Sequence, residues 1–106
     1  MRLVCKVLQV PSPPKTRLYR GFPPGVPGQE PGELMEGADI LLMEKTEDGI
    51  SLCRYTASGN LAGDTWHANV EDAKHQVDFE FDGMISPWVN IPPGVTDVVE
   101  FALRSY

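Results

Sequence analysis

Residues 11–37 are the part of this sequence that most restricts how the chain can fold. They contain seven of the ten prolines and five of the ten glycines. Three Pro-Gly steps, at 24–25, 27–28 and 31–32, are typical of type II turns, because proline fixes φ and glycine accepts a positive φ. Neither a helix nor a central strand tolerates this composition, so we expect a long Pro/Gly-rich loop.

Regular structure is expected on both sides of this loop. A length of 106 residues allows one domain over 1–106. Runs rich in Val, Leu and Ile between turn residues predict a mainly antiparallel sheet, and two amphipathic segments predict helices packed on one of its faces, an α+β fold. The predicted strands are 2–10, 39–46, 50–56, 61–67 and 88–91, and the predicted helices are 69–82 and 97–105.

Single residues mark the ends of these elements. Asn69 and Thr96 are expected to cap the two helices. Gly49 ends the link between the strands 39–46 and 50–56, and we expect it in the left-handed conformation. In the first helix His75 lies away from the apolar stripe and is expected to face solvent.

Charge is unevenly distributed along the chain. Residues 1–20 carry five basic and no acidic residues, whereas residues 21–106 carry four basic and all 15 acidic residues, a net charge of −11. An acidic body repels phosphate, so duplex nucleic acid is a poor partner. We expect no membrane association, because no apolar run approaches the ~20 residues that span a bilayer.

Within the loop, basic and apolar side chains alternate in a short region. We expect residues 15–22 to pack on a folded surface, of the same chain or of a second copy, and residues 24–32 to be more mobile. The candidate partner-binding residues are Lys15, Arg17, Tyr19, Arg20 and Phe22.

The two cysteines, Cys5 and Cys53, match no recognised spacing. Because no secretory signal is visible, we expect reduced thiols, a cytoplasmic location and no disulfide between them.

The segment Asp64-Thr65-Trp66-His67 leads directly into a capped helix and is the candidate ligand-binding site. In one interpretation His67 acts there as a base, a ligand or a donor. In the other, Trp66 fills the core, Thr65 satisfies the sheet edge and His67 bonds a loop carbonyl. We predict no catalytic residue, metal site or cofactor, because neither metal-ligand spacing nor a nucleophile motif is present.

A set of residues between positions 54 and 92 forms a recognisable pattern. Its members are Arg54-Tyr55, Gly59, Gly63-Asp64-Thr65-Trp66-His67, Glu71-Asp72-Ala73, Glu80-Phe81, Trp88 and Ile91-Pro92. On these residues, about a third of the chain resembles a group of small bacterial proteins. The resemblance implies a strand–turn–strand–helix–strand unit and carries over no activity. Short acidic proteins of this kind are associated with mobile bacterial DNA, including toxin–immunity loci.

Two functional hypotheses follow. The first is a non-enzymatic module that binds a protein partner, as an immunity protein does, or associates with a second copy in a homodimer. The alternative is a small-ligand-binding domain or enzyme with a site around Asp64, Thr65 and His67, and a deep pocket beside His67 would favour it.

Overall fold

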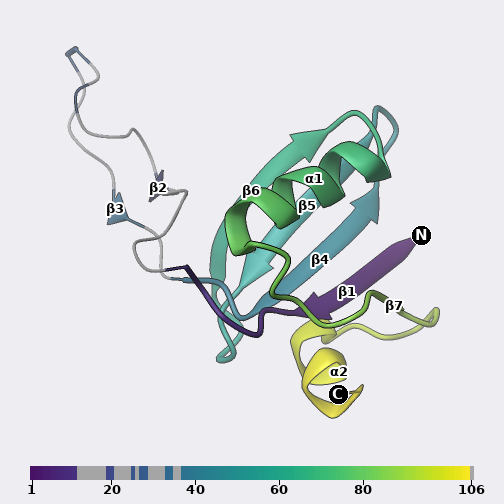
Figure 1. Cartoon of the computed structure of the whole chain (residues 1–106). Helices are drawn as coiled ribbons and strands as arrows, with labels where there is room; N and C mark the ends of the chain where they lie inside the picture. Colours follow the sequence, from purple (N-terminus) through teal and green to yellow (C-terminus); the bar gives the residue numbers. More distant parts are fainter. Residues whose placement is uncertain (12–18, 21–24, 26, 29–32, 35–36, 106) are drawn as a thin grey trace.

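The computed structural model describes residues 1–11, 19–20, 25, 27–28, 33–34 and 37–105. Five antiparallel strands form one sheet in the order β6-β5-β4-β1-β7 (Figure 1). The predicted α+β class and the mainly antiparallel sheet are therefore confirmed. The elements of this body are β1 (Arg2–Lys6), β4 (Ile40–Lys45), β5 (Ile50–Tyr55), β6 (Leu61–His67), α1 (Val70–Phe81), β7 (Val89–Asn90) and α2 (Val98–Ser105).

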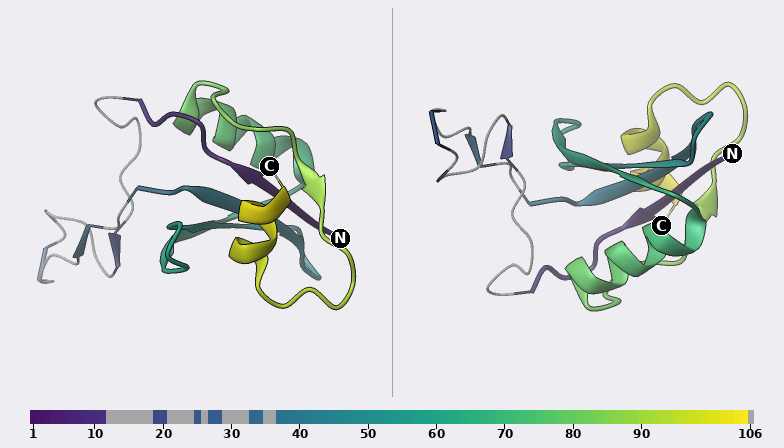
Figure 2. Two further views of the ribbon diagram at one scale, coloured as in Figure 1. Left: turned by 90° about the horizontal axis from the view of Figure 1, so that it is seen from below. Right: turned by 90° about the horizontal axis from the view of Figure 1, so that it is seen from above.

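Two short strands lie within the Pro/Gly-rich loop, where the sequence predicted none. β2 (Tyr19–Arg20) pairs antiparallel with β3 (Glu33–Leu34) as a separate sheet, to one side of the larger sheet (Figures 1 and 2). Neither strand contains proline or glycine, so the local composition permits a two-residue ladder.

Most expectations for the loop fall outside the described residues. These include the side chains of Lys15, Arg17, Tyr19, Arg20 and Phe22, of which Tyr19 and Arg20 are described in their backbone alone. The packing predicted for residues 15–22 and the mobility predicted for 24–32 therefore stay predictions.

The two helices pack on opposite faces of the sheet, so the predicted packing on one face is wrong. In β4, Ile40 and Leu42 belong to the core beneath α2. Leu41 and Met43 belong to the cores beneath α1. Because successive side chains of a strand point to opposite faces, the sheet lies between the helices (Figure 2). The inner strands are apolar on both faces, and each face has its own helix.

Helix α1 follows the sequence prediction closely. The side chain of Asn69 accepts a hydrogen bond from the Asp72 backbone N–H at 2.9 Å, which caps the helix. Ala73 and Val77 are buried against the sheet, and His75 is exposed as predicted.

Helix α2 begins one residue later than Thr96 would require. The Asp97 carboxylate accepts a hydrogen bond from the Glu100 N–H at 3.0 Å, so Asp97 is the cap and the prediction of Thr96 is wrong. A carboxylate also interacts favourably with the positive end of the helix dipole.

The turn between β4 and β5 needs glycine for a reason other than the one predicted. The φ angle of Gly49 is not positive, so the left-handed conformation is absent there. Instead, a Cβ atom at Gly49 would collide with the carbonyl oxygen of His67 and lie 2.7 Å from Cζ2 of Trp66. The β6 strand therefore packs directly on this turn.

Both cysteines are free, which confirms the prediction that no disulfide joins them. Cys5 lies on β1 beneath α1, whereas Cys53 lies on β5 and points to the opposite face, where it packs beside the core under α2. The intervening strand β4 keeps the two thiols apart. Among the described residues, no helix is long and apolar enough to cross a membrane.

Candidate functional site

The four predicted site residues are divided between the two faces of the sheet. Thr65 lies opposite Leu52 in β5, and Trp66 lies opposite Ser51. Thr65 and His67 therefore point to the α1 side, whereas Asp64 and Trp66 point to the other side. The segment therefore contributes to two separate surfaces.

On the α1 side, Arg54 and Glu80 form a buried ion pair between β5 and α1. Their exposed fractions are 1% and 4%. Nε of Arg54 donates to Oε1 of Glu80 at 3.0 Å, and Nη2 donates to Oε2, so the contact is bidentate. Gln76 donates to the same carboxylate at 2.8 Å. These bonds satisfy charges that would be costly to bury alone.

Thr65 connects this ion pair to His67. Its hydroxyl oxygen accepts hydrogen bonds from Nη1 and Nη2 of Arg54, both at 3.2 Å, and lies 2.7 Å from Nε2 of His67. Since both lone pairs of the hydroxyl are used, its hydrogen points to Nε2, which must accept. His67 is thereby held neutral with its proton on Nδ1.

The pKa of His67 agrees with this assignment. Burial and then the nearby Arg54 charge lower the pKa of His67 below its usual 6.5, while Asp72 and Glu80 oppose the shift. The bond partner is Thr65, not a loop carbonyl as one interpretation predicted. Sequence reasoning had not placed Arg54, Gln76 and Glu80 in a site with Thr65 and His67.

On the other side of the sheet, Trp66 is 57% exposed. The expectation that it fills the core is wrong, because α2 packs over β1 and β4 and no other described element covers the β6 side of this face. One edge of the indole ring rests on Gly49. We call the uncovered area the open sheet surface, formed by Glu44, Ser51, Leu61, Asp64 and Trp66.

The open sheet surface is acidic and apolar. Burial raises the pKa of the Tyr55 hydroxyl, and the charges of Glu44 and Asp64 raise it further, together with the neighbouring Cys53. Both carboxylates therefore act on the same face. Leu61, at the end of the open sheet surface away from Trp66, is 44% exposed.

Strand β6 is also an edge of the sheet. It is the end strand in the order β6-β5-β4-β1-β7, and its outer side pairs with no strand among the described residues. The exposed Trp66 and an unpaired strand edge thus occur together in one element.

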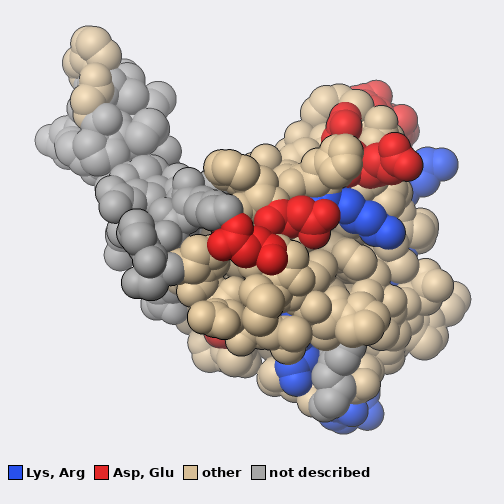
Figure 3. Space-filling view, in the orientation of Figure 1, with Lys and Arg blue, Asp and Glu red and all other residues tan. Residues whose placement is uncertain are grey.

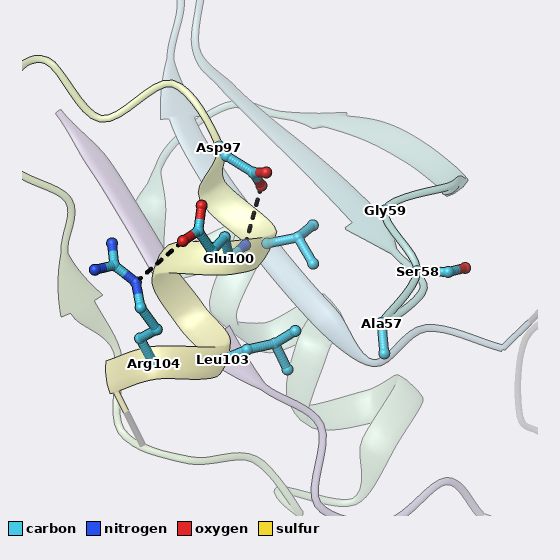
Figure 4. A pocket seen from close by; sticks show the side chains of 8 residues that line it. Ala57, Ser58, Gly59, Asp97, Glu100, Leu103 and Arg104 are labelled. Atoms are coloured by element: carbon cyan, nitrogen blue, oxygen red, sulfur yellow. Dashed lines mark hydrogen bonds and ion pairs between the residues drawn. The ribbon is translucent and has the colours of Figure 1, made fainter.

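Two pockets occur elsewhere on the described surface. The first, of about 280 Å³, lies between α2 and the Ala57–Gly59 turn. The side chain of Leu103 points from the helix toward the turn (Figure 4). Its charged groups are already engaged, because Asp97 caps the helix and Glu100 pairs with Arg104 at 3.6 Å. The second, of about 210 Å³, lies beside Phe81 and Met84. Neither pocket is lined by His67.

The outer face of α1 carries further acidic side chains. Figure 3 shows them gathered over this helix, and Glu71, Asp72 and Asp78 are exposed there. Phe79, at 54% exposure, lies on the same helix. Within the described ranges, no group of three or more His, Cys, Asp or Glu side chains is arranged to hold a metal ion.

No family model, curated protein or solved structure matches this chain. The resemblance to a group of small bacterial proteins stays a prediction.

Proposed function

We propose that this chain is a non-enzymatic protein-binding module whose open sheet surface receives the partner. The observation that carries the proposal is the exposure of Trp66 on an edge strand. Trp is enriched at the centres of protein interfaces, where a large rigid ring adds contact area at little cost in conformational entropy. An unpaired edge offers backbone hydrogen bonds beside it.

The alternative ligand site is less well supported. Its two α1-side members, Thr65 and His67, are hydrogen-bonded to each other, and Thr65 also accepts from the buried Arg54. The Thr65 hydroxyl and Nε2 of His67 are therefore already engaged within the protein. The described pockets lie away from these residues, whereas a small-molecule site is usually a concave pocket with convergent polar groups.

A selection from displayed random peptides tests the proposal. Peptides enriched on the wild-type protein should bind Trp66→Ser at least roughly tenfold more weakly, the usual loss at an interface centre. Phe79→Ser removes another exposed aromatic residue from α1 and should leave binding unchanged. Selected peptides that bind both variants as well as wild type would rule out the open sheet surface.

Unfolding in urea shows whether the variants are folded. Because Trp66 is more than half exposed, Trp66→Ser should remain folded and retain a cooperative transition. Loss of binding by a folded variant then reports on the surface itself.

A further inference from the structure

We infer that the partner segment is an extended, basic strand that adds to the outer edge of β6, with a Lys or Arg beside Asp64 and an apolar side chain beside Trp66. This inference rests on the proposed function and specifies the chemistry of the partner. It combines the free edge, the charge of the open sheet surface and the alternation of side chains in β6.

The edge is regular where the proposed strand would pair. Residues from Asp64 to His67 follow β5 in unbroken register, whereas the register shifts between Cys53 and Tyr55. Gly63, with a φ of 112°, lies at this irregularity. An edge strand directs every second N–H and C=O outward, so the stretch 64–67 can pair with an added strand.

The charges near this edge favour a basic segment. Asp64 is exposed, and no described Lys or Arg forms an ion pair with it. Glu44 lies on the same face. Arg2 lies opposite Glu44 in the sheet, but its guanidinium donates to the carbonyl oxygens of Val95 and Pro92 instead.

The side-chain alternation of β6 sets the pattern of the partner. A residue directly opposite Asp64 in an added strand would point to the same face, and so would the residue two positions along, opposite Trp66. A basic residue at the first position meets a carboxylate, and an apolar or basic residue at the second meets the indole ring. The recognised pattern is a basic and an apolar residue separated by one residue, in the order that the direction of the added strand sets.

A second copy of this chain fits the edge less well. A two-fold pairing centred on Asp64 would place two carboxylates directly opposite each other, which is destabilising. Residues 21–106 of each copy also carry a net charge of −11, with four basic and 15 acidic residues. A basic partner is attracted by the same charges that repel a second copy.

Three acetylated and amidated hexapeptides test the inference by amide NMR titration of the full chain. The Lys peptide is Lys-Thr-Val-Thr-Lys-Thr, which places Lys and Val two positions apart on one face in either strand direction. The Glu peptide has Glu at both Lys positions, and the Pro peptide has Pro in place of Val. The Lys peptide should shift the amides of 64–67 and the indole N–H of Trp66 and slow hydrogen exchange along β6. The Glu and Pro peptides should bind at least roughly tenfold more weakly, since they lack the charge or a backbone donor.

Matched variants separate a local contact from general attraction to an acidic protein. Asp64→Asn should weaken binding of the Lys peptide about threefold, as for an exposed cross-strand ion pair. Asp78→Asn removes an exposed carboxylate from α1 and should leave binding unchanged. Equal weakening by both variants, or equal binding of the Pro peptide, would overturn the inference.

Two further outcomes distinguish this inference from the proposed function. Selected peptides that depend on Trp66 but carry no basic strand pattern would leave the proposed function standing and refute the added basic strand. A dimer in sedimentation that protects the β6 amides and excludes the Lys peptide would replace the foreign strand with a second copy.

Discussion

At the scale of single residues, Arg54 and Glu80 are the charged side chains that the described core encloses. A buried ion pair adds little net stability compared with apolar residues of the same size, but removing one partner leaves an uncompensated charge. The pair therefore makes β5 and α1 depend on each other.

We expect Glu80→Leu to destabilise the fold by about 3–5 kcal/mol, because Arg54 then keeps its charge in the core without a carboxylate. The measurement is urea unfolding. Glu100→Gln, in the exposed pair with Arg104, should change stability by no more than about 0.5 kcal/mol. The double change Arg54→Met with Glu80→Leu should recover part of the loss, and a double variant no more stable than Glu80→Leu would contradict this account.

His67 predicts a pH dependence of stability with a definite sign. Its folded-state pKa is lowered, so between that value and the usual 6.5 the unfolded chain binds a proton that the folded chain does not. The stabilisation is complete above 6.5 and is lost as the pH falls through the folded-state value. His67→Gln supplies an oxygen acceptor for Thr65 without titrating, and its stability should fall less between about pH 7 and pH 5.

His75→Gln is the control for this experiment, because it removes the exposed histidine of α1. Its slope of unfolding free energy against pH shows the effect of removing a histidine outside the Thr65–Arg54 hydrogen bonds, and the His67→Gln slope is compared with it. A His67→Gln slope equal to that of wild type would show that the bond to Thr65 does not depend on protonation of His67.

The sequence pattern around Arg54 and Glu80 indicates that both side chains are buried. Arg54 continues the buried alternation of Ile50 and Leu52, and Glu80 lies next to Phe81 on the buried stripe of α1. A base and an acid, each on an otherwise apolar face, indicate a buried pair. Their contact across 26 residues could not be predicted, because it depends on how α1 crosses the sheet.

At the scale of elements, the turn between β4 and β5 is fixed by contact with β6. Gly49→Ala should destabilise the protein by roughly 1–3 kcal/mol, because the backbone carbonyl of His67 cannot move away from the added methyl group. Gly37→Ala, where nothing lies within 4 Å, should be neutral within about 0.5 kcal/mol. Thermal melts of both variants measure the difference, and equal melting temperatures would refute the steric argument.

The elements themselves were largely predictable, but their placement was not. Alternation, helical spacing and caps located the five strands and two helices of the body, although β1 ends at Lys6, four residues before the predicted end. Both helices were predicted on one face of the sheet, although β4 is apolar on both of its faces. Such a strand needs a covering layer on each side. The residues are Ile40, Leu41, Leu42 and Met43. The same error misplaced Trp66, since its exposure depends on where α2 ends over the sheet.

At the scale of the whole molecule, the thiols of Cys5 and Cys53 differ in how deeply they are buried. Cys5 is fully buried in an inner strand, and burial raises its pKa to about 12. Cys53 is partly exposed. In the folded protein an aromatic disulfide reagent should therefore modify Cys53 first, and Cys5 should react only when the sheet opens.

The Cys53→Ser variant isolates this second reaction. Its single thiol should react at a rate that rises with urea in parallel with unfolding. Rapid reaction of Cys5 in the native protein would show that β1 separates from the sheet without global unfolding. Cys5→Ser provides the matched measurement for Cys53.

The position of β1 between β4 and β7 has a consequence for the order of folding. Its neighbours in the sheet are residues 40–44 and 89–90, so each contact closes a long stretch of chain. The meander β4–β5–β6 involves much shorter closures and can form while β1 is still unpaired. Closure entropy grows slowly with length, about 0.6 kcal/mol for each doubling, so a long connection costs little stability but delays non-local pairing. We therefore expect β1, which is made first among these strands during synthesis, to complete its pairing last, after β7 has left the ribosome.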